Sequence, residues 1–216
     1  RARLAAAQEQ AQHRPQLCSL DPPPHAIADW QRLAGHAPLG ESRGGGRDGA
    51  VICYTSATTG LPKGVRASHD AELASARSFA RLWALGANDR LLLGLPLAYI
   101  YGLTTAALTA LVAGMPFVLM ERFEAPRALE LIEAHRCTVF MGVPTMHAML
   151  VEAVRLSKKS YDASSLRLAI SSGARLPAGV SEDFRATFGL SIYEFYASSE
   201  IRPVFAWDLS RGEVPQ

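Results

Sequence analysis

The sequence predicts an α/β protein with one or more largely parallel sheets and flanking helices. From residue 50 onward, short apolar or β-branched runs alternate with amphipathic helical segments, a pattern typical of βα units that join into a parallel sheet. The 216 residues are 49% apolar, which is enough for a substantial core in one sizeable domain. Glycines and prolines stand where helices are expected to end and begin, so they define the expected boundaries.

Residues 1–47 are expected to form a partly ordered segment with a flexible linker, and residues 48–216 to form the main domain. The segment reads as a polar helix, three prolines at positions 22–24, a short helical piece at residues 27–33 and the run ESRGGGRDG. Consecutive glycines between arginines are typical of a flexible connection. The N-terminus lacks the continuous apolar core of a secretory signal.

The first expected βα unit is a strand at residues 50–54 and a helix that starts near Ser68 and ends at Gly86. Serine is a favourable N-cap because its hydroxyl accepts a backbone N–H bond, and glycine commonly follows the last helical residue. The apolar face of this helix consists of Leu73, Ala76, Ala80 and Trp83.

The later units continue the alternation. Strands are expected at residues 91–95, 117–120, 138–141, 166–171 and 192–195. Helices are expected at residues 103–113, closed by Gly114, and at residues 178–188, closed by Gly189. Pro126 suits the first turn of a helix that carries Leu129, Ile132 and His135 on one face, and Pro144 opens a helix to about residue 154.

Residues 91–120 carry no charged side chain, so by length alone they qualify as a membrane-spanning candidate. Five turn-forming residues interrupt the run, namely Gly94, Pro96, Gly102, Gly114 and Pro116. We therefore expect a strand, a buried helix and a second strand, without membrane insertion.

Charge and cysteine content exclude several classes of function. A net charge of +2 with acids and bases interspersed provides no broad basic surface for nucleic acid or a membrane. Cys18, Cys53 and Cys137 are far apart and form no C-x-x-C pair, so neither a disulfide framework nor a zinc ribbon is indicated. A reducing cytoplasm is the expected location.

Residues 54–65, YTSATTGLPKGV, are called the phosphate loop here because their side chains suit a phosphate. The loop combines hydroxyls, glycines that expose backbone N–H groups and one ammonium group, at Thr55, Ser56, Thr58, Thr59, Gly60, Gly64 and Lys63. It lacks the GK[ST] ending of a Walker A loop. The alternative interpretation is a polar strand-to-helix connection with a solvated lysine.

The phosphate loop resembles the signature [YF]TSGTTGxPKG of adenylate-forming enzymes, which include acyl-CoA synthetases, nonribosomal adenylation domains and luciferases. Ala57 replaces a glycine of that signature. Three further segments resemble family motifs in the family's order: PLAYIYG at residues 96–102, SSGARLP at 171–177 and EFYASSE at 194–200. The resemblance covers about residues 48–202 and implies the large N-terminal domain of such an enzyme, incomplete and without the C-terminal domain.

The resemblance also implies a nucleotide site. Tyr196 is expected to stack on adenine, Ser199 to bond the α-phosphate, and Glu200 to bind Mg²⁺ as a catalytic residue. Lys63 is expected to be catalytic by offsetting phosphate charge. The remaining expected nucleotide contacts are Gly173, Ala174 and Glu194 together with the phosphate loop. Arg175 and Ala197 are departures, since the family commonly has proline or a small residue at the first and glycine at the second.

The acid is expected to lie beside the nucleotide. Tyr99 occupies the place of a family histidine, which closes over the carboxylate, and is the third expected catalytic residue; it can offer one hydrogen bond but not imidazole chemistry. The other expected substrate contacts are Tyr101, Gly142, Val143 and Ser171. His147, on the helix after Val143, is expected to pack or to lie on the surface rather than to be catalytic.

The implied reaction is ATP-dependent activation of a small carboxylic acid, with an apolar or aromatic acyl group, followed by thioester formation. The thiol comes from CoA or from phosphopantetheine on an acyl carrier protein. The chain by itself is expected to be inactive because the resemblance stops before the family's C-terminal domain. The alternative is a degenerate nucleotide-binding or scaffolding domain without ligase activity, suggested by Ala57, Tyr99 and Ala197.

Overall fold

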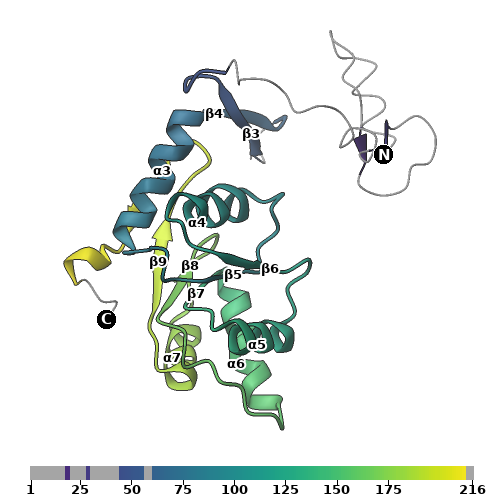
Figure 1. Ribbon diagram of the computed structural model, residues 1–216, viewed down its shortest axis with the longest axis vertical. Coiled ribbons are helices and arrows are strands. Elements are labelled where there is room, and N and C mark those ends of the chain that lie inside the picture. The colour runs from purple at the N-terminus through teal and green to yellow at the C-terminus, as the bar shows by residue number, and fades with distance from the viewer. Residues whose placement is uncertain (1–17, 20–27, 30–43, 56–59, 213–216) are drawn as a thin grey trace. The chain divides into compact units, whose positions relative to one another are not determined.

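The computed structural model describes residues 18–19, 28–29, 44–55 and 60–212 (Figure 1). The chain divides into two compact units, residues 1–44 and residues 45–216. In the first unit, β1 (Cys18–Ser19) pairs in parallel with β2 (Ala28–Asp29). The prediction of a helix at residues 27–33 is therefore wrong at residues 28–29, because their backbone pairs with β1 as a strand. The other elements expected in residues 1–43 lie outside the described residues.

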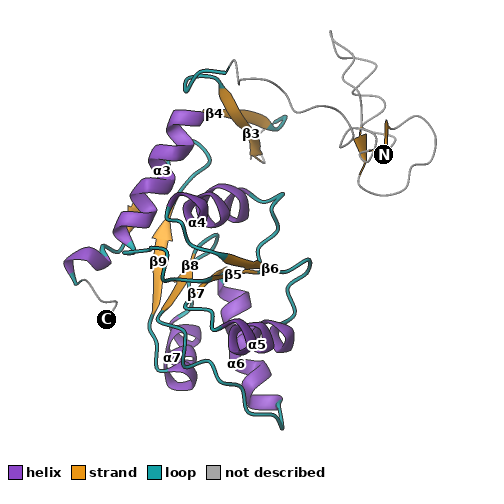
Figure 2. Ribbon diagram, in the orientation of Figure 1, coloured by secondary structure: helices purple, strands orange, loops and turns teal. Residues whose placement is uncertain are grey.

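The second unit contains a six-stranded sheet in the order β10-β9-β8-β7-β5-β6 (Figure 2). The five strands from β9 to β6 are parallel, and β10 is antiparallel at the edge. The bounds are β5 Leu91–Leu93, β6 Phe117–Leu119, β7 Val139–Gly142, β8 Leu168–Ser171, β9 Ile192–Tyr196 and β10 Phe205–Ala206. The expected α/β class with a largely parallel sheet is confirmed. The short strand β10 was not expected.

Helices cover both faces of this sheet. Figure 2 shows α5 (Ala125–His135), α6 (Pro144–Leu156) and α7 (Ala178–Phe188) on one face, and α3 (His69–Leu82) and α4 (Leu108–Val112) on the other. Pro126 and Pro144 lie in the first turns of their helices, and Gly189 follows α7 with φ 69°, as expected. His135 is exposed as the last residue of α5, so the face shared with buried Leu129 and Ile132 does not extend to it.

The helix α3 begins as expected but ends early. Ser68 is its N-cap, and the hydroxyl accepts a bond from the Ala71 N–H at 3.3 Å. The helix stops at Leu82 rather than near Gly86, because Trp83 stacks on Phe79 in the core at 4.6 Å between ring centroids and Ala84 turns to φ 47°. Gly86 instead lies in the turn before β5.

The helix expected at residues 103–113 starts two residues earlier, and its first part is a π-helix, Tyr101–Ala107. The Thr104 hydroxyl donates to the Ile100 carbonyl at 3.0 Å within this segment. The segment continues as α4 and closes at Gly114, whose φ is +67°. Within the part of the chain that the structure describes, no helix has the length and apolar character needed to cross a membrane.

The expected strand at residues 50–54 forms, but its place in the fold is different. It is β3 (Gly49–Thr55), which pairs antiparallel with β4 (Lys63–Ser68) in a separate hairpin. The phosphate loop therefore connects two antiparallel strands, and the expectation of a strand-to-helix connection at the end of a parallel strand is wrong. The strand β4 was missed because KGVRAS has only one strongly β-forming residue, Val65.

Candidate functional site

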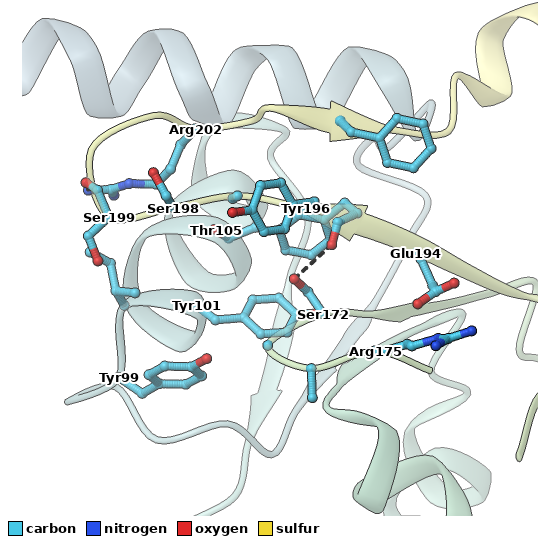
Figure 3. A pocket seen from close by; sticks show the side chains of 16 residues that line it. Tyr99, Tyr101, Thr105, Ser172, Arg175, Glu194, Tyr196, Ser198, Ser199 and Arg202 are labelled. Atoms are coloured by element: carbon cyan, nitrogen blue, oxygen red, sulfur yellow. Dashed lines mark hydrogen bonds between the residues drawn. The ribbon is translucent and has the colours of Figure 1, made fainter. Parts of the chain in front are cut away.

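A cavity of about 640 Å³ opens at the carboxyl ends of β8 and β9 (Figure 3). Ligands commonly bind at this edge of a parallel sheet, where the strands end. The lining residues come from the turn after β5 and the π-helix that follows it, from the turn after β8, and from the segment that runs from β9 to the start of β10. They are Tyr99, Ile100, Tyr101, Thr105, Ser172, Gly173, Ala174, Arg175, Glu194, Phe195, Tyr196, Ala197, Ser198, Ser199, Arg202 and Phe205.

The turn after β8 brings bare backbone to the cavity at Gly173. This residue has φ +87°, and a Cβ added to it would lie 3.0 Å from the Tyr99 hydroxyl and 3.3 Å from Val143 Cγ1. The neighbouring Ser172 hydroxyl donates to the Phe195 carbonyl at 2.8 Å, which ties the turn to β9. Only glycine fits this position without strain, and a flat ligand can approach its backbone closely.

Two tyrosines form the wall that faces this turn. Tyr101 is buried, its ring meets the Phe195 ring edge-on at 5.1 Å, and its hydroxyl donates to the Ile170 carbonyl at 3.3 Å. Burial, with a smaller contribution from Tyr99, raises the pKa of Tyr101 well above its ordinary value. Tyr101 is therefore a neutral structural wall, whereas Tyr99 is 40% exposed and points its hydroxyl toward Gly173.

The strand β9 supplies the third side of the cavity. Tyr196, its last residue, is 62% exposed, so its ring is free to contact a ligand. Glu194 faces Arg175 across the same edge in Figure 3, and its carboxylate accepts a bond from the Leu176 N–H at 3.1 Å. After β9 the chain turns sharply, since the Ser198 N–H donates to the Ile201 carbonyl at 2.9 Å. This turn carries Ser199 and Glu200.

Arg202 is a cavity residue that the sequence reasoning missed. Its guanidinium is buried and donates to both carboxylate oxygens of Glu72, at 2.6 and 2.8 Å, and to the Thr104 hydroxyl at 2.9 Å. It also donates to the Ser199 carbonyl at 3.2 Å. Because Glu72 lies 130 positions earlier in the chain, no local spacing could have revealed this pair.

A second cavity, of about 550 Å³, lies on the other side of the Ser199 turn. Glu200, Ser199 and Arg202 line it together with Val65 of β4 and the start of α3. The hairpin also reaches the turn directly, since Cys53 Sγ lies 3.9 Å from the Ser199 hydroxyl oxygen.

A family model described as "AMP-binding enzyme" matches residues 2–216. The chain belongs to this family of AMP-binding enzymes. It is similar to a long-chain-fatty-acid–CoA ligase of Bacillus subtilis, with 33% identity over 74% of this chain and 29% of that protein. It is also similar to an indoleacetate–CoA ligase of Aromatoleum aromaticum, with 32% identity over 88% of this chain and 38% of that protein.

The fold also resembles solved structures. The fold matches apo MatB from Rhodopseudomonas palustris with a TM-score of 0.73 and 32% identity, over 82% of this chain and 34% of MatB. The chain thus spans about a third of the length of the relatives it matches.

In this AMP-binding enzyme, the structure brings together seven of the residues expected at the site. They are Tyr99, Tyr101, Gly173, Ala174, Glu194, Tyr196 and Ser199, all of which line the first cavity. Glu200 lines the second cavity instead.

Three expected substrate residues lie behind the wall of the cavity. Val143 Cγ1 would lie 3.3 Å from a Cβ atom added to Gly173. The Gly142 carbonyl accepts a bond from the Ser172 N–H at 3.3 Å, and Ser171 is fully buried, with no hydrogen-bond partner for its hydroxyl among the described residues.

The phosphate loop is only partly described. Ser56, Ala57, Thr58 and Thr59 lie outside the described residues. Among the described ones, Thr55, Gly60, Lys63 and Gly64 do not line the first cavity. The Thr55 hydroxyl donates to the Lys63 carbonyl at 3.4 Å across the hairpin, while Lys63 and Gly60 are exposed.

The chemistry of the residues at the site can be compared with the needs of a nucleotide and of a metal ion. The exposed Tyr196 ring and the open backbone of Gly173 suit a flat base. The described residues contain no group of three or more His, Cys, Asp or Glu side chains that could hold a metal by themselves. One carboxylate, such as exposed Glu200, is compatible with Mg²⁺, which is usually held by one or two carboxylates together with substrate phosphates.

Proposed function

We propose that this chain is the nucleotide-binding part of a ligase that uses ATP to activate a carboxylic acid and transfers the acyl group to a thiol. First, a carboxylate oxygen attacks the α-phosphorus of ATP, and the bond from that phosphorus to pyrophosphate breaks, which leaves an acyl-adenylate. Next, the thiol of CoA, or of phosphopantetheine on an acyl carrier protein, attacks the acyl carbon and AMP departs.

One observation carries this proposal: Tyr99, Gly173 and Tyr196, from three distant parts of the sequence, surround one cavity at the carboxyl end of the sheet. The assigned roles follow from chemistry. Tyr196 stacks on adenine, Gly173 leaves room for it, and the Ser199 hydroxyl donates to the α-phosphate. Such a reaction depends on positioning and charge neutralisation rather than on a protein nucleophile.

Two residues of the chain can help to neutralise the negative charge of the phosphates, one directly and one by binding Mg²⁺. We assign the ammonium of Lys63 to the β- and γ-phosphates and the carboxylate of Glu200 to Mg²⁺. When bound, Mg²⁺ neutralises phosphate charge as the bond to pyrophosphate breaks. Loss of one well-placed donor at such a site typically lowers the rate by about 10² to 10³.

For the acid we propose an apolar or aromatic acyl group. The rings of Tyr99 and Tyr101, 6.3 Å apart between centroids, support this choice because they present apolar surface beside Gly173. Two relatives are named for a long-chain fatty acid and for indoleacetate. Another, from mouse, is a malonate–CoA ligase, so a dicarboxylic acid belongs among the acids tested.

The test is ATP–pyrophosphate exchange by the intact gene product that contains this chain, with fatty, aromatic and dicarboxylic acids. We expect exchange with an apolar acid, and about a hundredfold lower rate for Lys63→Met. The matched control is Lys159→Met, which removes an exposed lysine near Glu130 and Tyr161. Exchange with no acid would contradict the proposal and favour the scaffolding alternative. CoA and a holo carrier protein, compared as acceptors, then identify the thiol.

A further inference from the structure

We infer that Arg202 and Glu72 are positioning residues that hold the Ser199–Glu200 turn in the geometry needed to bind ATP with Mg²⁺. This inference rests on the proposed function, because it assigns a purpose to a pair that supports the residues placed at the phosphates.

The pair is a buried ion pair with several bonds. The side chains of Arg202 and Glu72 are 8% and 5% exposed, and one guanidinium nitrogen bonds both oxygens of the carboxylate. Burial of two charges is costly unless each finds several partners, and here Thr104 supplies one more acceptor to the guanidinium. A stability role alone does not require this arrangement, since apolar side chains of similar volume often serve equally well.

The remaining bond of the guanidinium points to function. Arg202 donates to the Ser199 carbonyl, at the peptide group that joins Ser199 to Glu200. Both cavities share Ser199 and Arg202 as wall residues, so this bond fixes the partition between them. Figure 3 shows Arg202 behind Ser199 and Ser198, on the side toward α3. The backbone from which the Ser199 hydroxyl and the Glu200 carboxylate extend is therefore held by this guanidinium.

The same guanidinium connects the segments that carry the site. Glu72 lies in the first turn of α3, which follows β4 of the hairpin directly. Thr104 belongs to the π-helix that begins at Tyr101 in the cavity wall. A movement of the turn relative to either segment must break a buried, charge-assisted bond, which costs more than breaking a neutral one.

The experiment measures how much Mg²⁺ the intact gene product needs to bind ATP, by calorimetric titration of ATP at a series of Mg²⁺ concentrations. For Arg202→Met we expect the half-maximal Mg²⁺ concentration to rise about tenfold or more, the usual effect of losing a residue that orients a metal ligand. Arg202→Lys should give an intermediate rise, because an ammonium cannot form all four bonds at once. If the role of Arg202 were purely structural, a smaller fraction of the protein molecules would bind ATP, but the half-maximal Mg²⁺ concentration would stay unchanged.

Two further variants secure the result. The double variant Glu72→Leu with Arg202→Met replaces the ion pair by apolar groups, so it should fold even if the single variant does not, and it should still need more Mg²⁺. The matched control is Arg167→Met, which removes the arginine that pairs with the Asp89 carboxylate. This variant should need as much Mg²⁺ for ATP binding as the wild type. A wild-type Mg²⁺ requirement in a folded Arg202 variant overturns the inference alone. Lack of exchange by the wild type with every acid overturns the proposed function.

Discussion

At the scale of single residues, His147 shows how far the fold can bury a titratable group. Its ring lies between the rings of Phe140 and Phe184, at 5.1 and 5.3 Å between centroids. Nδ1 lies 3.0 Å from the Val143 carbonyl oxygen, and Nε2 has no hydrogen-bond partner in the part of the chain that the structure describes. Burial lowers the pKa of His147 from 6.5 to about 4, against the opposing effect of the Val143 bond. Of the two expected roles, packing and a surface position, the structure confirms packing, since His147 is fully buried.

Acid should therefore destabilise the fold through this one ring. Between pH 6.5 and about 4 the unfolded histidine binds a proton while the folded one stays neutral, so the free energy of unfolding falls as pH falls. Since one pKa unit corresponds to about 1.4 kcal/mol, His147 accounts for a loss of about 3 kcal/mol between pH 7 and pH 4.

Urea unfolding at a series of pH values, for the wild type and for His147→Phe, measures this loss. Phenylalanine keeps an aromatic ring between its two neighbours but cannot titrate. The difference in unfolding free energy between the two proteins should change by about 3 kcal/mol across that pH range. A constant difference would show that the ring is protonated in the folded state.

At the scale of elements, a single carboxylate ties the amino ends of the parallel strands together. Asp89, in the turn before β5, accepts bonds from the Gly86 N–H, the Thr138 hydroxyl and the Arg167 guanidinium. Thr138 and Arg167 directly precede β7 and β8. Burial acts to raise the pKa of Asp89, but these hydrogen bonds outweigh it, so the pKa lies below its ordinary value.

Asp89→Asn should destabilise the fold by about 2–4 kcal/mol, because it removes the negative charge that pairs with Arg167. It also places the amide NH₂ group, a hydrogen-bond donor, opposite groups that are themselves donors. ATP affinity should not change, since the site lies at the opposite ends of these strands. Denaturant unfolding and calorimetric titration with ATP measure the two effects. Asp183→Asn, in the exposed pair with Arg155, is the control and should change stability little. Equal effects of the two substitutions would contradict the role assigned to Asp89.

The elements also show what could be predicted from sequence. The helices α6 and α7 and the strands β5 to β9 were predictable, because Pro144 marks the start of α6, Gly189 marks the end of α7, and the apolar runs mark the strands. The antiparallel pairing of β3 and β4 was not, because a strand does not encode its partner locally. Likewise, Tyr196 and Gly173 could be predicted for the site from their motifs, whereas Arg202 gains its partners only through the fold.

At the scale of the whole molecule, binding and stability are separated along the sheet. The cavity lies at the carboxyl ends of the strands, while the Asp89 bonds lie at the amino ends. The strand β8 spans the four residues between Arg167 and Ser172, which corresponds to roughly 15 Å. Residues that far apart without shared partners usually contribute independently.

Gly173→Ala tests this separation. A methyl group at φ +87° is strained and approaches Tyr99 and Val143, so we expect ATP binding to weaken about tenfold or more, with a stability loss of about 1–2 kcal/mol. Combined with Asp89→Asn, the stability losses should add within about 0.5 kcal/mol. Gly179→Ala is the control, because its added methyl would meet no atom within 4 Å. Strong non-additivity would indicate that the two ends of the sheet are coupled.

The stacking of Trp83 on Phe79 has an optical consequence. The indole is fully buried, and its centroid lies 5.4 Å from that of the Phe195 ring. The backbone carbonyl of Phe195 accepts a hydrogen bond from the Ser172 hydroxyl at the cavity. Its fluorescence should therefore peak at short wavelength, and it should change if a ligand in the cavity shifts the Phe195 ring. The other tryptophan among the described residues, Trp207, is only partly buried and should emit at longer wavelength. Emission of Trp83 during a titration with ATP would therefore test whether occupancy of the cavity reaches this aromatic cluster.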